Sequence, residues 1–387
     1  MKIVIVCDIL GVPNNGTSIA SYNLINHLKE KGHQVEVICP DEDKKGQEGF
    51  HVLETLSLGI FNNYVKKNGV VIAKRDKKLL DRVLKDADIV HIMLPFLVGH
   101  AAAKYCHKHN IPLTTGFHVQ AENVMSHFFL MHVALANRIT YKFMWNSIHK
   151  YASAIHFPTQ FICDYVKRYG IVPPKSYVIS NGVDKMFTAK KVEKPEQYKD
   201  KCVIMMSGRY SKEKNQKLLL KAIRKSKYQD KIQLILAGGG PRFKSLEKYS
   251  KKHLINQPCF KLFKREELPD VINYCDLYVH TSSVEIEAIS CLEAISCGVV
   301  PCISDSKKSA TSKFALVKQS HFKNDNAKDL ANKIDWWIEH KDFLKEMSPK
   351  YSEFAKQFSF ESCMEKMEQM LLEVIKDYEQ KKNQPNI

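Results

Sequence analysis

Short apolar runs recur along the chain, and each is followed by a polar turn and by a segment whose apolar residues have helical spacing. In the first half, these runs occupy residues 2–7, 34–40, 87–94, 111–118, 152–158 and 177–183. In the second half, the rhythm restarts with runs at 202–209, 233–241, 259–264, 276–282 and 299–305. Runs of this length that alternate with helices predict parallel sheets built from βαβ units.

The two series predict two doubly wound, Rossmann-like α/β domains, and 387 residues suit two domains of ordinary size. Ligands bind such folds at the carboxyl ends of the strands, and we expect the two domains to face a shared cleft. A polar, basic stretch at the junction places the domains at residues 1–185 and 186–360. Residues 361–387 have the periodicity of a final helix, which we expect to pack back on the first domain.

The composition is that of a globular protein, with 44% apolar and 26% charged residues. The eleven cysteines include no CxxC pair, which favours reduced thiols packed in a core. Asp8 interrupts the apolar N-terminus, and no apolar stretch approaches the roughly 20 residues of a membrane span, so we expect a cytoplasmic protein. The net charge of +17 predicts an anionic partner, and charge alone leaves nucleic acid, a membrane surface and a phosphorylated substrate open.

The most informative stretch is TSSVEIEAISCLEAISCGVVPCISD, at residues 281–305. A strand is predicted to end at the Thr-Ser-Ser loop and a helix to begin near Glu285, which puts Glu293 just over two turns further along. Glu293 lies among apolar residues, where a carboxylate needs polar partners. The two carboxylates share a face only loosely, so we expect them to contact different parts of an elongated ligand with hydroxyl groups, such as ribose or a sugar.

This stretch resembles the Glu-x7-Glu motif of the retaining glycosyltransferases of family 4, which have the two-domain GT-B architecture. The resemblance extends over almost the whole chain, with several blocks in the expected order. SGRYSKEKN, at 207–215, resembles the Gly-Arg-x4-Lys block of that family, and AGGGP, at 237–241, resembles a turn that we expect to be structural. The resemblance implies that Arg209 and Lys214 hold the donor diphosphate and stabilise it as it leaves, with a role in catalysis.

Further donor contacts follow from the same resemblance. Lys264 lies in a segment similar to the one that surrounds the nucleobase in the family. Glu293 is expected to bind the ribose, and Glu285 the transferred sugar, where it would act in catalysis. Ile286 and Glu287 stand where many relatives have Gly-Phe or Pro-Phe, so their backbone amides are expected to reach the sugar. The extra carboxylate of Glu287 leaves the identity of the sugar open.

The first domain offers candidates at its predicted strand ends. NNGTS, at 14–18, resembles the glycine-bearing loop after the first strand, which implies that Gly16 contacts the donor phosphate and Thr17 the acceptor. His118 closes a predicted strand and resembles a family histidine near the transferred sugar, so it is a candidate catalytic residue. Glu122 and Asn123 follow on the adjoining loop and are candidates for the acceptor site.

The resemblance implies transfer of a hexose from a UDP-sugar, first of all UDP-glucose, with retention of the anomeric configuration. It also implies that no metal or other cofactor is required. Residues 124–151 mix aromatic and aliphatic residues with Arg and Lys, and with the net positive charge they predict a surface for anionic lipid at the inner face of the cell membrane. The expected acceptor is then a membrane lipid or a polyprenyl-linked glycan, although an interior helix would show the same aromatics.

Several other functions compete with this one. A glycosyltransferase for a soluble or polysaccharide acceptor, or a catalytically silent nucleotide-sugar-binding protein, would share these motifs. Nucleic-acid binding is disfavoured because the sequence has no RNP-like aromatic block, zinc-ligand spacing or compact basic helix. A Rossmann oxidoreductase would need G-x-G-x-x-G after the first strand, and GVPNNG lacks that spacing.

Overall fold

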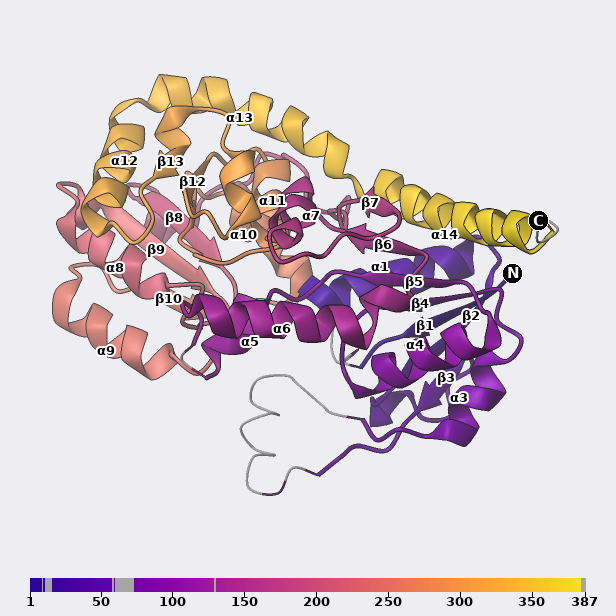
Figure 1. The fold of residues 1–387 in the computed structure, drawn as a ribbon. Coiled ribbons are helices and arrows are strands. Elements are labelled where there is room, and N and C mark those ends of the chain that lie inside the picture. The colour runs from indigo at the N-terminus through magenta and orange to yellow at the C-terminus, as the bar shows by residue number, and fades with distance from the viewer. Residues whose placement is uncertain (9, 11–15, 58, 60–72, 129, 384–387) are drawn as a thin grey trace. The chain divides into compact units, whose positions relative to one another are not determined.

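The computed structural model of the protein describes residues 1–8, 10, 16–57, 59, 73–128 and 130–383. The chain divides into two compact units, the first formed by Met1–Asn181 with Glu361–Ile387 and the second by Gly182–Phe360. Each unit contains a parallel sheet accompanied by helices (Figure 1). The predicted α/β class, with two doubly wound domains, is thereby confirmed.

The first unit has a seven-stranded sheet in the order β3-β2-β1-β4-β5-β6-β7. Its strands are β1 (Lys2–Val6), β2 (Gln34–Cys39), β3 (Phe50–Val52), β4 (Ile89–Ile92), β5 (Leu113–Gly116), β6 (Ala154–Phe157) and β7 (Ser176–Val178). Its helices are α1 (Gly16–Glu30), α3 (Lys77–Leu84), α4 (Leu97–His109), α5 (Ala121–Ser126), α6 (Ala134–Ser147), α7 (Gln160–Lys167) and α14 (Phe360–Asn383). The strands β4, β5 and β6 are buried along their whole length, which explains why the sequence there shows continuous apolar runs and no alternation.

The final helix α14 packs within the first unit, although the rest of that unit comes from the first 181 residues of the chain. Its apolar side chains Met364, Met367, Leu371 and Val374 recur at helical spacing and are almost fully buried. On its polar side, Glu368 accepts hydrogen bonds from two histidines of the first 35 residues, at 3.2 and 2.9 Å. The buried apolar stripe of α14 and its polar contacts therefore hold this C-terminal helix and the N-terminal part of the chain in one unit.

The second unit has a six-stranded sheet in the order β10-β9-β8-β11-β12-β13. Its strands are β8 (Cys202–Ser207), β9 (Ile232–Ala237), β10 (Cys259–Lys261), β11 (Leu277–His280), β12 (Pro301–Ser304) and β13 (His321–Phe322). Its helices are α8 (Gln216–Lys225), α9 (Phe243–His253), α10 (Leu268–Asn273), α11 (Ile289–Ser296), α12 (Ala327–Glu339) and α13 (Lys341–Ala355). Of the helices that the structure describes, none has both the length and the apolar composition of a membrane span.

Candidate active site

The strand order of the second unit reverses between β8 and β11, and parallel sheets bind ligands beyond the carboxyl ends of their strands at such a point. The loop after β8 carries Arg209 and Lys214 and leads into α8. This loop is joined to the loop after β11, because Thr281 Oγ1 donates to the Lys214 carbonyl at 2.8 Å and the Ser283 amide donates to the Glu213 carbonyl at 3.0 Å. The two loops are therefore held together at the reversal point.

A glycine of the AGGGP turn lets the loop after β9 pass close to the Arg209 loop. A Cβ added at Gly238 would lie 2.2 Å from the carbonyl oxygen of Gly208, and the φ of Gly238 is +151°, so only glycine fits without strain. The Arg209 carbonyl accepts a hydrogen bond from Gln216 Nε2 at 2.7 Å, which fixes the same loop to the start of α8. Backbone packing thus sets the place from which the Arg209 side chain extends.

Lys214 and Glu285 form an ion pair at the ends of β8 and β11. Their side chains are 20% and 11% exposed, so water screens the pair only weakly. His280, buried at the end of β11, lies with its Nε2 3.3 Å from the same Glu285 oxygen, although the orientation is not that of a hydrogen bond. Burial by itself raises the pKa of Glu285, but attraction by Lys214 and then by His280 outweighs it and lowers that pKa to about 2. Glu285 is therefore an anion at neutral pH.

The helix that follows Glu285 begins later than the sequence pattern suggested. We predicted a helix from near Glu285, which is wrong, since α11 begins at Ile289. The Glu285 amide donates to the Lys308 carbonyl at 3.3 Å, and the Glu285 carbonyl accepts from the Ala310 amide at 2.9 Å. The second bond occupies the Glu285 carbonyl, which a helix beginning there would pair with the Ile289 amide. Ala288, with a φ of +63°, has the left-handed conformation that an α-helix excludes.

The second carboxylate of the motif has a different environment. Glu293 lies in α11 with its side chain 7% exposed, and Arg265 Nη1 donates to Glu293 Oε1 at 3.2 Å. Burial raises the pKa of Glu293, and attraction by Arg265 only partly offsets this effect. Lys264, the neighbour of Arg265, is exposed, whereas Ile286 and Glu287 are buried in the turn before α11. The two motif carboxylates therefore belong to separate ion pairs.

In the first unit, the strand order reverses between β1 and β4. Gly16 and Thr17 are the first residues of α1, while Asn14 and Asn15 of the NNGTS loop lie outside the described residues. Gly16 is exposed, and a Cβ added there would meet no described atom within 4 Å. Contact of Gly16 with the donor phosphate and of Thr17 with the acceptor stays a prediction.

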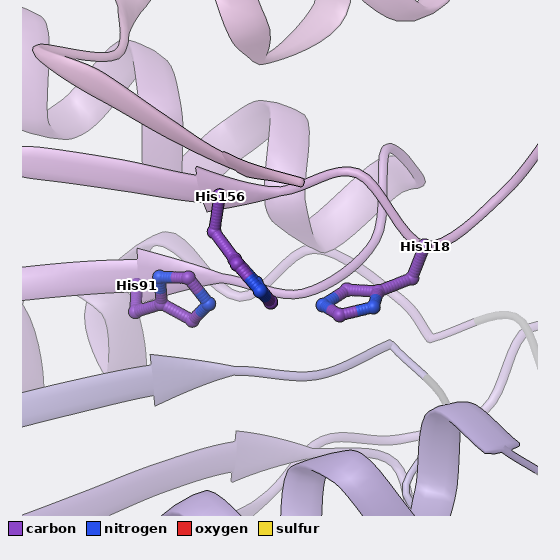
Figure 2. A group of neighbouring side chains, drawn as sticks. All are labelled: His91, His118 and His156. Carbon is purple, nitrogen blue, oxygen red and sulfur yellow. The ribbon is translucent and has the colours of Figure 1, made fainter. Parts of the chain in front are cut away.

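His118 lies two residues after β5, and its ring folds back toward the sheet. His91 of β4 and His156 of β6 face it, and Figure 2 shows the ring of His156 between the other two. One ring nitrogen from each residue lies within 4.8 Å of the other two, which makes a group able to hold a metal ion. Burial, followed by the neighbouring rings, lowers the pKa of His118 well below its usual value, and burial lowers the pKa of His91 to about 3.

The two acceptor candidates after β5 differ in their surroundings. Glu122 is fully buried, and its carboxylate oxygens accept hydrogen bonds from Tyr141 at 2.7 Å and from Tyr165 at 2.6 Å. These contacts tie α5 to α6 and α7, which favours a structural role for Glu122 over contact with an acceptor. Asn123 is half-buried, and its Oδ1 has no hydrogen-bond partner within the described part of the chain. Asn123 is therefore the better acceptor candidate of the two.

Comparison with known families covers nearly the whole chain. Residues 187–358 match the family described as glycosyl transferases group 1, and residues 14–186 match glycosyltransferase family 4. The chain belongs to these group 1, family 4-type glycosyltransferases. The protein is thus a glycosyltransferase, and the predicted resemblance is confirmed.

Three known proteins are similar to this glycosyltransferase in structure or in sequence. Anabaena Alr3699/HepE in complex with UDP and glucose superposes with a TM-score of 0.75 at 17% identity, covering 96% of this chain and 100% of that one, and shares the GT-B fold. The catalytic domain of cholesterol-α-glucosyltransferase from Helicobacter pylori is 46% identical, covering 41% of this chain and 98% of that one, with a TM-score of 0.40. The GPI3 subunit of phosphatidylinositol N-acetylglucosaminyltransferase from Saccharomyces cerevisiae is 32% identical over 111 residues, which span 28% of this chain and 24% of the relative.

The partners of the two motif carboxylates are not evident from the sequence of this glycosyltransferase. His280 and Arg265 contact Glu285 and Glu293, yet neither was singled out. A signal existed for His280, because it is the last residue of a buried strand directly before the Thr-Ser-Ser loop. The signal for Arg265 was weaker, because Arg265 only follows Lys264 in the segment that resembles the nucleobase site of the family.

Proposed function

We propose that this glycosyltransferase moves a hexose from a UDP-sugar, first of all UDP-glucose, to a lipid or polyprenyl-linked acceptor at a membrane surface, with retention of configuration. The observation that carries the proposal is the Lys214–Glu285 ion pair at the ends of β8 and β11. A cation for a diphosphate and an ionised carboxylate for sugar hydroxyls are the two groups that such a donor needs at adjacent positions. HepE, which shares the fold, was solved with UDP and glucose, which supports this class of donor.

The protonation state of Glu285 bears on the mechanism that we propose. With a pKa of about 2 it holds no proton at neutral pH, so it is unsuited to act as a general acid toward the leaving group. We therefore assign protonation to the substrate itself. The acceptor oxygen forms its bond to the anomeric carbon on the face that the diphosphate leaves, and the acceptor proton passes to a diphosphate oxygen. Arg209 and Lys214 stabilise the negative charge that develops there, and the positive end of α8 adds to this effect.

The nucleoside end of the donor is assigned to the second ion pair. Glu293 accepts hydrogen bonds from the ribose hydroxyls, while attraction by Arg265 partly offsets the rise in the Glu293 pKa that burial causes. Lys264 and its neighbours contact the base. No step in this scheme requires a metal ion, and we propose that transfer is metal-independent. Full activity in EDTA is expected, and loss of activity that Mn²⁺ restores would contradict this part of the proposal.

A membrane-borne acceptor is supported by the surface of α6. Leu135, Ile139 and Phe143 follow one another at intervals of four residues, and they are 67%, 61% and 63% exposed. Arg138 and Lys142 are exposed beside them. A helix that presents a stripe of large apolar side chains with flanking cations is suited to lie in the interface of an anionic membrane. The yeast relative, named for transfer to phosphatidylinositol, supports a lipid acceptor as well.

The activity is tested by UDP release from UDP-sugars and GDP-sugars, with and without bacterial lipid extract. We expect release from UDP-glucose that depends on lipid, an α-linked product by NMR, and loss of both in Glu293→Ala. Release with soluble glycans but not with lipid would favour the alternative acceptor. Binding of UDP-glucose without release under any condition would identify a silent nucleotide-sugar-binding protein and refute the proposal.

Membrane contact is tested separately by sedimentation with vesicles at low salt. The wild type should pellet with phosphatidylglycerol vesicles and not with phosphatidylcholine vesicles, and Ile139→Glu should weaken binding by at least a factor of about five. Val172→Glu is the matched control, because Val172 is equally exposed at 68% in the same unit but lies outside α6. Equal pelleting of both variants would argue against α6 as the membrane surface.

A further inference from the structure

Three histidines of the first unit converge because of the register of three adjacent strands. His91 in β4 is paired with Thr114 in β5, and Gly116 in β5 is paired with His156 in β6. Paired residues of neighbouring strands point to the same face, and so do residues two apart in one strand. The side chains of His91 and His156 therefore lie on one face of the sheet, on either side of β5.

Gly116 provides the space for the third ring on that face. A Cβ at Gly116 would lie 2.3 Å from Nε2 of His118, so any larger residue would displace this ring. The chain after β5 turns His118 back over Gly116, and the ring centroids of His118 and His156 are 5.3 Å apart. The sequence thus combines two strand histidines, a glycine between them and a loop histidine that fills the gap.

Hydrogen bonds on the outer side of the group define the protonation of two rings. His156 Nε2 lies 2.7 Å from the Ile179 carbonyl, which can only accept, so Nε2 carries the proton and Nδ1 presents a lone pair. His91 Nδ1 lies 2.9 Å from Thr114 Oγ1, whose own proton is directed to the Val90 carbonyl at 3.4 Å. With the Thr114 proton directed to that carbonyl, Nδ1 of His91 donates to Thr114 and its Nε2 presents a lone pair to the interior.

The nitrogens that face the centre of the group have no hydrogen-bond partners among the residues that the structure describes. These atoms are His91 Nε2, His118 Nε2 and His156 Nδ1, and His91 and His156 are 0% and 2% exposed. Buried polar atoms without partners are costly, and they usually contact water or an ion. A single water molecule has two hydrogens to donate, whereas one cation can accept lone pairs from three nitrogens at once.

We propose that His91, His118 and His156, all in the first unit, bind one divalent transition-metal ion, with Zn²⁺ as the first candidate. Three neutral imidazoles without a carboxylate suit Zn²⁺, Cu²⁺ or Ni²⁺ and do not suit Mg²⁺ or Ca²⁺. The hydrogen bonds of His91 to Thr114 and of His156 to the Ile179 carbonyl are outer contacts of the kind that orient metal-ligating histidines.

The distances define the movement that the ion would require. Tetrahedral Zn²⁺ with bonds of about 2.0–2.1 Å holds its ligand atoms about 3.4 Å apart, against at most 4.8 Å in this structure. His91 and His156 are anchored in strands, so we assign the closing movement to the His118 ring on its loop. Three protein ligands would leave a fourth position for water.

The test uses the full chain, dialysed against EDTA and then titrated with Co²⁺ and, in competition, with Zn²⁺. We expect one equivalent of Co²⁺ with the visible absorption of a four-coordinate ion, displaced by Zn²⁺. His118→Gln and His156→Gln should each weaken Zn²⁺ binding by at least a factor of about ten, and Thr114→Val, which removes only an outer contact, by about 10- to 100-fold. Gly116→Ala should also abolish binding while all three histidines remain.

Two variants serve as controls. His149→Gln removes another fully buried histidine of the same unit, bonded to Thr115 at 2.8 Å and outside the group, and should leave binding unchanged. Glu368→Gln tests the other cluster of histidine and carboxylate groups near α14 and should also bind normally. Circular dichroism establishes folding of each variant. No Co²⁺ spectrum, or equal affinity in His118→Gln, would overturn the proposal and leave buried water in the group. Because no sugar donor is present, this result is independent of the proposed transferase reaction.

Discussion

Replacing Lys214 with methionine removes the cation beside Glu285 and keeps an unbranched side chain of similar length. The folded protein holds the Glu285 pKa at about 2, against an ordinary value of 4.5. At about 1.36 kcal/mol for each pKa unit, this difference corresponds to about 3 kcal/mol of preference for the ionised form. Because the folded-state pKa is lowered, the stabilisation is present above pH 4.5 and is lost as the pH falls toward 2. Between pH 5 and pH 3, Glu285 alone should cost about 2 kcal/mol of the free energy of unfolding.

The measurement needs a probe of the second unit alone, and the tryptophans supply it. Trp336 and Trp337 lie in α12 of this unit, and Trp145 lies in the first. In a Trp145→Phe background, urea unfolding followed by tryptophan fluorescence therefore reports the second unit. Lys214→Met should lower the free energy of unfolding at pH 7 by about 3 kcal/mol, because it leaves a buried carboxylate without its cation.

A double-mutant cycle with Glu285→Gln separates this effect from packing. In the Glu285→Gln background, Lys214→Met should cost less than about 1 kcal/mol, so the coupling energy should be about 2 kcal/mol. The reference protein should also lose about 2 kcal/mol more than Glu285→Gln between pH 5 and pH 3. A coupling energy below about 0.5 kcal/mol, or parallel pH dependences, would refute the view that Lys214 keeps Glu285 ionised.

Three other outcomes are expected of the second unit. Gly238→Ala should lower its free energy of unfolding by at least about 2 kcal/mol, since the new Cβ would lie 2.2 Å from a carbonyl oxygen, whereas Gly239→Ala, with no atom within 4 Å, should change it by less than about 0.5 kcal/mol in the same urea assay. Arg265→Met should weaken UDP binding at least about tenfold by calorimetry, because loss of the cation raises the pKa of Glu293 further, and an unchanged Kd would contradict this assignment. Glu285→Gln should tighten UDP binding, because Lys214 loses its competing carboxylate, while transfer slows by a factor of about 100 or more; looser binding would show that the pair does not compete with the diphosphate.

The fold was predictable because burial on both faces makes the central strands continuous apolar runs. β1, β4, β5, β6, β8 and β11 all fall inside predicted runs. The strands β3 and β13, each at one edge of its sheet, were missed because they have only two or three residues and part of their surface is accessible. The strands at the opposite edges, β7 and β10, are as short but overlap the predicted runs at 177–183 and 259–264. Local pattern therefore identified the sheet interiors and failed at one edge of each sheet, where pairing with a neighbouring strand decides the conformation.

The chemistry of the sites was predictable only in part. The spacing of residues in the sequence indicates which residue types a site contains, but not which of them contact one another in the fold. Lys214 and Glu285 were each assigned to the donor, but their mutual ion pair depends on the reversal between β8 and β11. The histidine group was missed although a signal existed. The runs ADIVH and ASAIH, which end at His91 and His156, place a histidine at the same position of two buried strands. Comparison of strands with one another, and not of residues along one strand, would have found it.

The late start of α11 changes the meaning of the eight-residue spacing between Glu285 and Glu293. On a continuous helix, Glu285 and Glu293 would differ only by 80° of rotation and two turns, and their environments would be similar. In the structure the spacing combines an extended bridge, a left-handed residue at Ala288 and one turn of α11 before Glu293. This break lets Glu285 pair with Lys214 from the loop after β8, while Glu293 pairs with Arg265 from the segment before α10. Burial then raises the pKa of one carboxylate, and a cation lowers the pKa of the other. The motif therefore requires a fixed length of chain with a break inside it, and a substitution that extended α11 back to Glu285 would separate the carboxylate from its cation without changing either residue.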